Sequence, residues 1–209
     1  MTLKTEFINQ LRTILGEVGG KDLSIKDSAK SEHFITRSTV SDNLVKNGKS
    51  FGFISFIRSD QATSGRYSGL SVKVNPGISH YRLSLDIGDD GFGDDYQLTT
   101  LPGMRRQFLN FQQDIIKYRE QTHADIKTFC SLDFSSDDTK RQLSDLESDY
   151  RDDEIDSHPK DLFVAFVKKP KLVNDGEEFD QNEDFWIVFK ALAATFALLR
   201  QWPNGKESK

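Results

Sequence analysis

The sequence contains one cysteine, Cys130, among 209 residues. A single thiol excludes an internal disulfide, and it excludes a zinc site built from several cysteines. We interpret Cys130 as a small, half-buried apolar residue and expect a reducing, cytoplasmic setting.

Long apolar stretches are also missing. The first seven residues include an acid and no apolar run, so they do not have the pattern of a signal peptide. The longest apolar stretch, residues 185–199, is interrupted by Lys190 and is shorter than the about 20 residues that a membrane-spanning helix needs. We therefore expect no membrane partner.

Catalytic motifs are scarce. Gly48-Lys49-Ser50 resembles the end of a phosphate-binding P-loop, but Asn43 stands where that motif requires glycine. The acidic run at 89–95 lacks the spacing of a calcium-binding EF-hand. None of the four histidines has a second one four residues away, as a helical zinc pair would need: His33, His80, His123 and His158. We expect no metal, no cofactor and no catalysis by this chain.

A metal-dependent nuclease stays open as one alternative. Such an enzyme needs an acid and an acid-x-Lys triplet on paired strands, which hold a divalent ion beside the scissile phosphate. Asp125-Ile126-Lys127 and Asp138-Thr139-Lys140 match the short triplet. Neither triplet lies on a segment with a convincing strand pattern, so the sequence disfavours this function.

Charge is unevenly distributed along the chain, whose net charge is −5. Residues 33–83 contain seven basic and two acidic residues, a net charge of +5, whereas residues 84–160 contain nine basic and eighteen acidic residues, a net charge of −9. A polyanion is attracted by the first segment and repelled by the second. The alternatives are random clustering of surface charge, and a protein-interaction or immunity module whose acidic half binds a basic partner.

The first half of the chain has a helical pattern followed by strand patterns. Apolar residues at helical spacing run from Phe7 to Val18, and Gly19-Gly20 ends that helix. The apolar period then changes to two, which predicts short strands. Asn47-Gly48 and Asn75-Pro76-Gly77 are turn signals between them. We expect one antiparallel meander with strands at 34–40, 51–57, 67–74 and 81–87.

The second half alternates between helix and strand. We expect a helix over about 104–119, a strand at 162–167 and a long helix over about 182–200. The whole pattern predicts an α+β fold, a curved antiparallel sheet with an N-terminal helix, a middle helical segment and a long C-terminal helix packed on it. Residues 1–203 form a single domain in this interpretation, with 133–160 a polar, partly helical insertion and 204–209 a polar tail or linker.

One segment carries a family resemblance. Residues 51–67, FGFISFIRSDQATSGRY, combine an aromatic-aliphatic strand, a polar loop with Gln and Ser-Gly, and an aromatic residue before the next strand, which leads through a turn to HYRLSLDIGD at 80–89. This succession resembles the N-terminal DNA-recognition domain of McrB-type modification-dependent restriction systems, the MrcB-like N-terminal domain family. The resemblance covers residues 34–102 in detail and the later elements only in order and type. Gly52-Phe53 stands where the family has Pro-Trp, and the connection at 108–160 is longer.

The resemblance implies a function. Members of the family bind duplex DNA that contains a modified cytosine, such as 5-methylcytosine, and flip that base into an aromatic-lined pocket. Flipping costs a few kcal/mol of lost stacking and pairing, which the pocket must offset by stacking and hydrogen bonds. As the recognition module of a restriction or antiviral defence system, the chain would work with a nucleotide-dependent motor and a nuclease in other subunits or domains.

The resemblance also assigns residues. The base pocket would contain Phe53, Tyr67 and His158, with Leu70 and Ser71 judging the size of the base substituent. The loop 42–50 would enter the duplex, with Leu44 or Val45 filling the gap left by the base. DNA phosphates would be contacted, without sequence readout, by Lys46, Lys49, Arg58, Arg66 and Lys73. The alternatives are that Phe53 and Tyr67 belong to the core of the sheet and that Leu44 and Val45 cap a hairpin.

Overall fold

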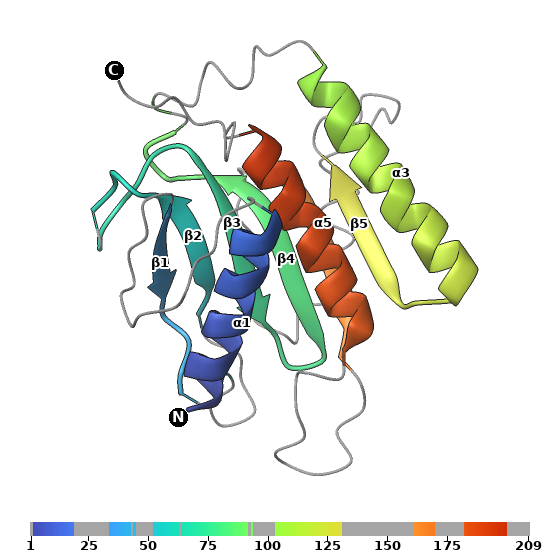
Figure 1. Ribbon diagram of the computed structural model, residues 1–209, viewed down its shortest axis with the longest axis horizontal. Helices are drawn as coiled ribbons and strands as arrows, with labels where there is room; N and C mark the ends of the chain where they lie inside the picture. The colour runs from blue at the N-terminus through green and yellow to red at the C-terminus, as the bar shows by residue number, and fades with distance from the viewer. Residues whose placement is uncertain are drawn as a thin grey trace.

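The computed structural model describes residues 2–18, 34–42, 44, 52–62, 64–91, 93, 103–130, 161–169 and 182–199. These ranges form three helices and one six-stranded sheet (Figure 1). In chain order the elements are α1 (Leu3–Val18), β1 (Phe34–Ser38), β2 (Ile54–Arg58), β3 (Leu70–Pro76), β4 (His80–Ile87), α3 (Met104–Thr122), β5 (Ile126–Cys130), β6 (Asp161–Lys168) and α5 (Glu183–Leu199).

The sheet is antiparallel throughout, with the strand order β1-β2-β3-β4-β6-β5. Its first four strands form the expected meander. The chain then leaves the sheet, passes through α3, adds β5 at the far edge and returns to place β6 between β5 and β4. β6 contains the continuous apolar run LFVAFV, buried at every position, which is the pattern of a strand enclosed on both faces.

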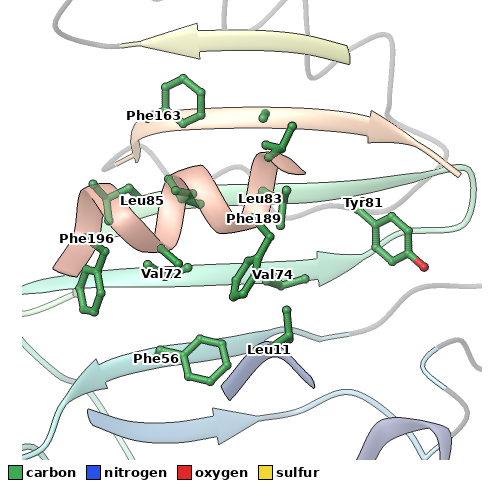
Figure 2. Packing of buried hydrophobic residues seen from close by; sticks show 14 of the residues in the cluster. Leu11, Phe56, Val72, Val74, Tyr81, Leu83, Leu85, Phe163, Phe189 and Phe196 are labelled. Carbon is green, nitrogen blue, oxygen red and sulfur yellow. The ribbon is translucent and has the colours of Figure 1, made fainter. Parts of the chain in front are cut away.

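All three described helices lie on one face of the sheet (Figure 1). α5 lies across β3, β4 and β6, with α1 and α3 packed on either side of it. The side of α5 toward the sheet is rich in phenylalanine, and Phe189 and Phe196 lie among Val72 of β3 and Leu83 of β4 (Figure 2). This arrangement confirms the predicted α+β fold with its N-terminal, middle and C-terminal helices.

The strand boundaries differ from the predicted ones for local reasons. β2 begins at Ile54 and not at residue 51, because Gly52 has a left-handed φ of 106° and the Phe53 amide donates to Thr39 Oγ1 at 3.0 Å. β3 begins at Leu70 and not at residue 67, because the backbone of Tyr67 and Gly69 bonds to the turn after β4. Side-chain periodicity does not reveal these loop contacts.

β5 was not predicted, and it corrects one sequence interpretation. Its five residues, IKTFC, have polar side chains at two of the three central positions, so no strand pattern is visible. β5 forms because it pairs with β6 over its whole length. The triplet Asp125-Ile126-Lys127 therefore does lie at a strand, with its last two residues opening β5.

None of the described helices is long and apolar enough to cross a membrane. The predicted insertion at 133–160 and the tail at 204–209 lie outside the described residues.

Candidate functional site

The two faces of the central strands differ in chemistry. Leu70, Val72 and Val74 of β3 belong to the core beneath the helices. Side chains alternate along a strand, so the residues between them point to the opposite face, here called the polar face. The strand register pairs its residues across β3 and β4 as Ser71–Asp86, Lys73–Ser84 and Asn75–Arg82.

The polar face is buried even though no described helix lies over it. Ser71, Arg82 and Ser84 are 0% exposed, and Asp86 is 2% exposed. The register continues the row Lys73–Ser84 to Ser55 of β2 and Arg37 of β1. Among the residues that the structure describes, three buried cationic side chains, Arg37, Lys73 and Arg82, share this face with the carboxylate of Asp86. Burying a charge is costly unless it is compensated, so these side chains need polar or charged partners.

Tyr67 lies at one end of the polar face and is held by a directed chain of hydrogen bonds. Ser71 Oγ donates to the carboxylate of Asp86, so it accepts from the Tyr67 hydroxyl, at 2.8 Å. Burial and the negative charge of Asp86 raise the pKa of Tyr67 to about 12. The phenol therefore stays neutral near pH 7, with its proton directed at Ser71.

Two half-buried aromatic rings on this side each face a cation. The Arg37 guanidinium carbon lies 5.2 Å from the centre of the Tyr67 ring, and Lys73 Nζ lies 4.8 Å from the centre of the Phe53 ring. Cations at this distance from an aromatic ring are attracted by its electron-rich face. Each of the two rings therefore has a cationic side chain over one of its faces.

Arg37 also organises the β2–β3 loop, described at residues 59–62 and 64–69. Its guanidinium donates to the carbonyl oxygens of Ala62, Ser64 and Gly65, with distances of 3.3 Å to Ser64 and 2.5 Å to Gly65. Gln61 Oε1 accepts from the Ser68 amide at 3.1 Å. The loop is therefore shaped by side chains within and beneath it.

The turn after β4 supports the same loop. The Gly69 amide donates to Gly91 O at 2.8 Å, and the Gly88 and Asp90 amides donate to Gly69 O and Tyr67 O at 2.9 and 3.1 Å. A Cβ atom at Gly88 would lie 2.2 Å from Tyr67 O, so only glycine allows this close approach. The two loops form one unit with Tyr67 at its centre.

Three of the predicted pocket residues share this site and one does not. Phe53, Tyr67 and Ser71 all contact the polar face or belong to it. Leu70 points to the opposite face and is 0% exposed in the core under the helices, so its predicted place in the pocket is wrong. Adjacent strand residues cannot line the same face. Ser71 is itself 0% exposed, so it acts on its surroundings through Tyr67 and Asp86.

Of the described residues that were predicted to contact DNA directly, some are buried and others lie nearer the surface. Leu44 is 7% exposed and packs in the core, which corrects its predicted insertion into a duplex. Lys73 is 5% exposed over Phe53, so its predicted contact with a phosphate is also corrected. Arg58 forms a bidentate pair with Asp60, which lowers the pKa of that carboxyl. Arg66 is exposed, and its phosphate contact stays a prediction.

Four predicted residues lie outside the described part of the chain: Val45, Lys46, Lys49 and His158.

Arg37 and Asp86, whose hydrogen bonds organise the site, were not predicted from the sequence. A signal was present in β4, where HYRLSLDI alternates between polar and apolar side chains. Such alternation is typical of a strand with one face in water, and it gives no indication that the polar side is buried.

The acidic triplet near β5 is engaged in a surface ion pair. Lys168 Nζ lies 2.8 Å from Asp125 Oδ2, and this hydrogen bond lowers the pKa of the Asp125 carboxyl. Within the residues described here, no three or more histidine, cysteine or acidic side chains group in a way that could hold a metal ion.

Comparisons with protein-family models, with curated proteins and with solved structures find no match for this chain.

Proposed function

We propose that this chain is a non-catalytic recognition module that binds duplex DNA and holds a flipped, modified cytosine at Tyr67. The supporting observation is the position of the Tyr67 ring. It is half-buried, with Arg37 over the ring and Ser71 bonded to its hydroxyl, where two interlocked loops meet. A flipped base requires stacking on an aromatic face, and a ring that is already fixed loses little entropy when the base arrives.

The contact set differs from the one that the resemblance implied. Phe53 and Tyr67 remain as stacking residues, and Ser71 with Asp86 positions the Tyr67 phenol. Arg66 remains as an exposed cation for a phosphate. The preference for a modified cytosine rests on the resemblance to the McrB-type domains, as do the motor and nuclease partners and the predicted roles of Val45, Lys46, Lys49 and His158.

The test is a binding panel of labelled duplexes that differ only in one cytosine, which is plain, 5-methylated or 5-hydroxymethylated, measured by fluorescence anisotropy. We expect one modified duplex to bind about tenfold or more tightly than the plain duplex, with an affinity that falls steeply as salt is added. A fluorescent base analogue at that position should brighten when it leaves the stack. Equal, salt-insensitive binding of all duplexes would contradict the proposal.

Variants of the chain make the test specific. Tyr67→Ala should weaken binding by about tenfold or more, because stacking of one base on an aromatic side chain contributes about 1–3 kcal/mol. Arg66→Ala should weaken all duplexes alike and reduce the salt dependence by about one phosphate contact. Lys117→Ala is the matched control, since Lys117 is an exposed cation on α3, on the other side of the sheet. It should leave binding unchanged.

The two alternatives are outcomes of related experiments. Cleavage of plasmid DNA in the presence of magnesium, lost in Asp125→Asn, would favour the nuclease, whose triplet does lie at a strand. Binding to a basic protein with no binding to any duplex would favour the protein-interaction module. The ion pair between Asp125 and Lys168 makes the nuclease the less favoured function, because a metal would have to displace Lys168.

A further inference from the structure

We infer that the tip of the β2–β3 loop, Ser64-Gly65-Arg66, is a binding site for a phosphate group formed by two backbone N–H groups and the Arg66 side chain. This inference rests on the proposed function and names the part of the molecule that would hold the DNA backbone. The same chemistry would also accept free inorganic phosphate.

The first observation is the direction of the loop carbonyls. Arg37 is 9% exposed, and its guanidinium donates to the carbonyl oxygens of both Ser64 and Gly65, so these two carbonyls point toward it. In a trans peptide the carbonyl and the following N–H point in opposite directions. The N–H groups of Gly65 and Arg66 therefore both point away from Arg37, toward the exposed side of the loop.

The second observation is that these two donors are unused. In the described ranges, neither the Gly65 nor the Arg66 amide donates a hydrogen bond. A Cβ atom built on Gly65 would meet nothing within 4 Å, so the space in front of the loop is open. Ser64 and Arg66 are exposed beside it, and they add a hydroxyl and a guanidinium group.

The third observation is the backbone conformation. Gly65 has φ of 83°, in the left-handed region that favours glycine. Turns that contain a left-handed residue direct successive N–H groups into one concavity, which binds anions. The hydrogen bonds of Arg37 fix this turn from below, and all three of them go to neutral carbonyl oxygens. Its positive charge is therefore not cancelled by them, and it adds to the attraction for an anion.

The nearest carboxylate along the chain does not oppose this role. Asp60 is bonded through both carboxylate oxygens by Arg58, which offsets its negative charge. Arg37 is accordingly a positioning residue, since it acts on the phosphate through the loop carbonyls and the cationic field. The groups that would touch the phosphate are the two amides and Arg66.

The inference is tested by amide chemical shifts of the ¹⁵N-labelled chain. Titration with inorganic phosphate should shift the Gly65 and Arg66 amides in a saturable way. A duplex DNA should shift the same two amides and should compete with phosphate. Phosphate shifts that do not saturate, or that leave these two amides unmoved, would overturn the site.

Substitutions separate the phosphate site from a general effect on the fold. Gly65→Ala should weaken phosphate binding about tenfold, because alanine disfavours the left-handed turn. Gly103→Ala is the matched control, since Gly103 has φ of 85° and equally open space, but lies at the start of α3. Arg37→Lys keeps the positive charge but cannot donate to the three loop carbonyls at once. It should therefore also weaken phosphate binding. It should increase amide hydrogen exchange in residues 64–69 alone.

The outcomes distinguish this site from the proposed function. If phosphate saturates the two amides but no duplex binds, the phosphate site stands and the DNA-recognition function fails. If a modified duplex binds through Tyr67 without moving the Gly65 and Arg66 amides, the function stands and the phosphate site is overturned. Equal weakening by Gly65→Ala and Gly103→Ala would also overturn it.

Discussion

The two faces of the central strands are buried to a similar degree by opposite kinds of side chain. On the helix side of β3 lie Leu70, Val72 and Val74, which contact apolar side chains of the core. On the polar face, Ser71, Lys73 and Asn75 are at most 8% exposed. Apolar burial is favourable by about 25 cal/mol per Å², whereas a buried polar group costs free energy unless it is hydrogen-bonded. Apolar burial on the helix side therefore stabilises the fold. Burial of the polar face does not stabilise the fold in this way, so the presence of polar side chains there needs a different explanation.

That reason is most visible at Tyr67. Hydrogen bonds lead from this ring through Ser71 to Asp86, and two cations of the polar face, Arg37 and Lys73, lie over the rings of Tyr67 and Phe53. The proposed recognition of a flipped base would use these two rings and this loop. The comparison between the faces can be tested by substitutions, beginning with the largest expected loss of stability.

Phe185→Ala should cause the largest loss. Phe185 is 0% exposed and contacts the rings of Phe7, Tyr81 and Phe189. Removing the ring should lower the free energy of unfolding by about 3–5 kcal/mol, measured by chemical denaturation. The control is Leu198→Ala on the same helix, where the side chain is 58% exposed and a change below about 0.5 kcal/mol is expected. Similar losses in both variants would contradict the packing described for α5.

On the polar face, Ser71→Ala and Ser84→Ala form a matched pair. Both serines are 0% exposed, but only the Ser71 hydroxyl is bonded, whereas Ser84 Oγ has no hydrogen-bond partner within the described residues. Ser71→Ala should lower the free energy of unfolding by about 1–3 kcal/mol, because it removes one hydrogen bond from each of the buried groups Asp86 and Tyr67. Ser84→Ala should be neutral or slightly stabilising. The reverse order would show that the chain of hydrogen bonds does not stabilise the fold.

Alkaline pH should act on the polar face through Tyr67. Its folded-state pKa of about 12 lies above the ordinary value of 10.0, mainly because the ring is buried. The corresponding stability is fully present below pH 10 and is lost as the pH rises toward about 12. Tyr67→Phe should make this loss less steep, measured as the free energy of unfolding against pH. Part of the loss should persist, since burial also raises the pKa of Tyr81. An unchanged slope in Tyr67→Phe would contradict the environment described for this phenol.

The smallest effect is expected at the ion pair between Lys168 and Asp125, where the side chains are 54% and 46% exposed. Lys168→Met should change the free energy of unfolding at neutral pH by at most about 1 kcal/mol. The hydrogen bond from Lys168 lowers the pKa of Asp125 below 3.8, so its contribution is present above that pH and is lost as the pH falls further. Chemical denaturation of the unsubstituted protein and of Lys168→Met, at neutral and at acidic pH, measures both effects. A larger loss would place this pair among the essential contacts of the sheet.

Much of the fold could be predicted from the sequence because hydrophobic periodicity reports which residues face a core. The four-strand meander, β6 and the helices α1, α3 and α5 all follow from that pattern. β5 could not be predicted, since Lys127 and Thr128 interrupt its apolar character and pairing with β6 supplies what the pattern lacks. Loop contacts at Phe53 and Tyr67, which periodicity does not report, moved the starts of β2 and β3.

The candidate site was predicted less completely. Phe53, Tyr67 and Ser71 follow from the resemblance and do lie at one site. Leu44, Leu70 and Lys73 were misplaced because a local segment does not show which neighbours will bury it. Arg37 and Asp86 were missed for the complementary reason, since their partners lie about 15 to 28 positions away along the chain.

The amino-acid sequence by itself determined the helices, the meander and the alternation of side chains along β3 and β4, because these depend on neighbours in the chain. Only the tertiary structure decided that the polar side of these strands is enclosed and that Arg37 holds the β2–β3 loop. It also decided that Leu70 packs in the core under the helices, whereas Ser71 lies on the polar face. The physical reason is that burial and hydrogen bonding between distant segments depend on the whole packed chain, whereas periodicity records only local preference.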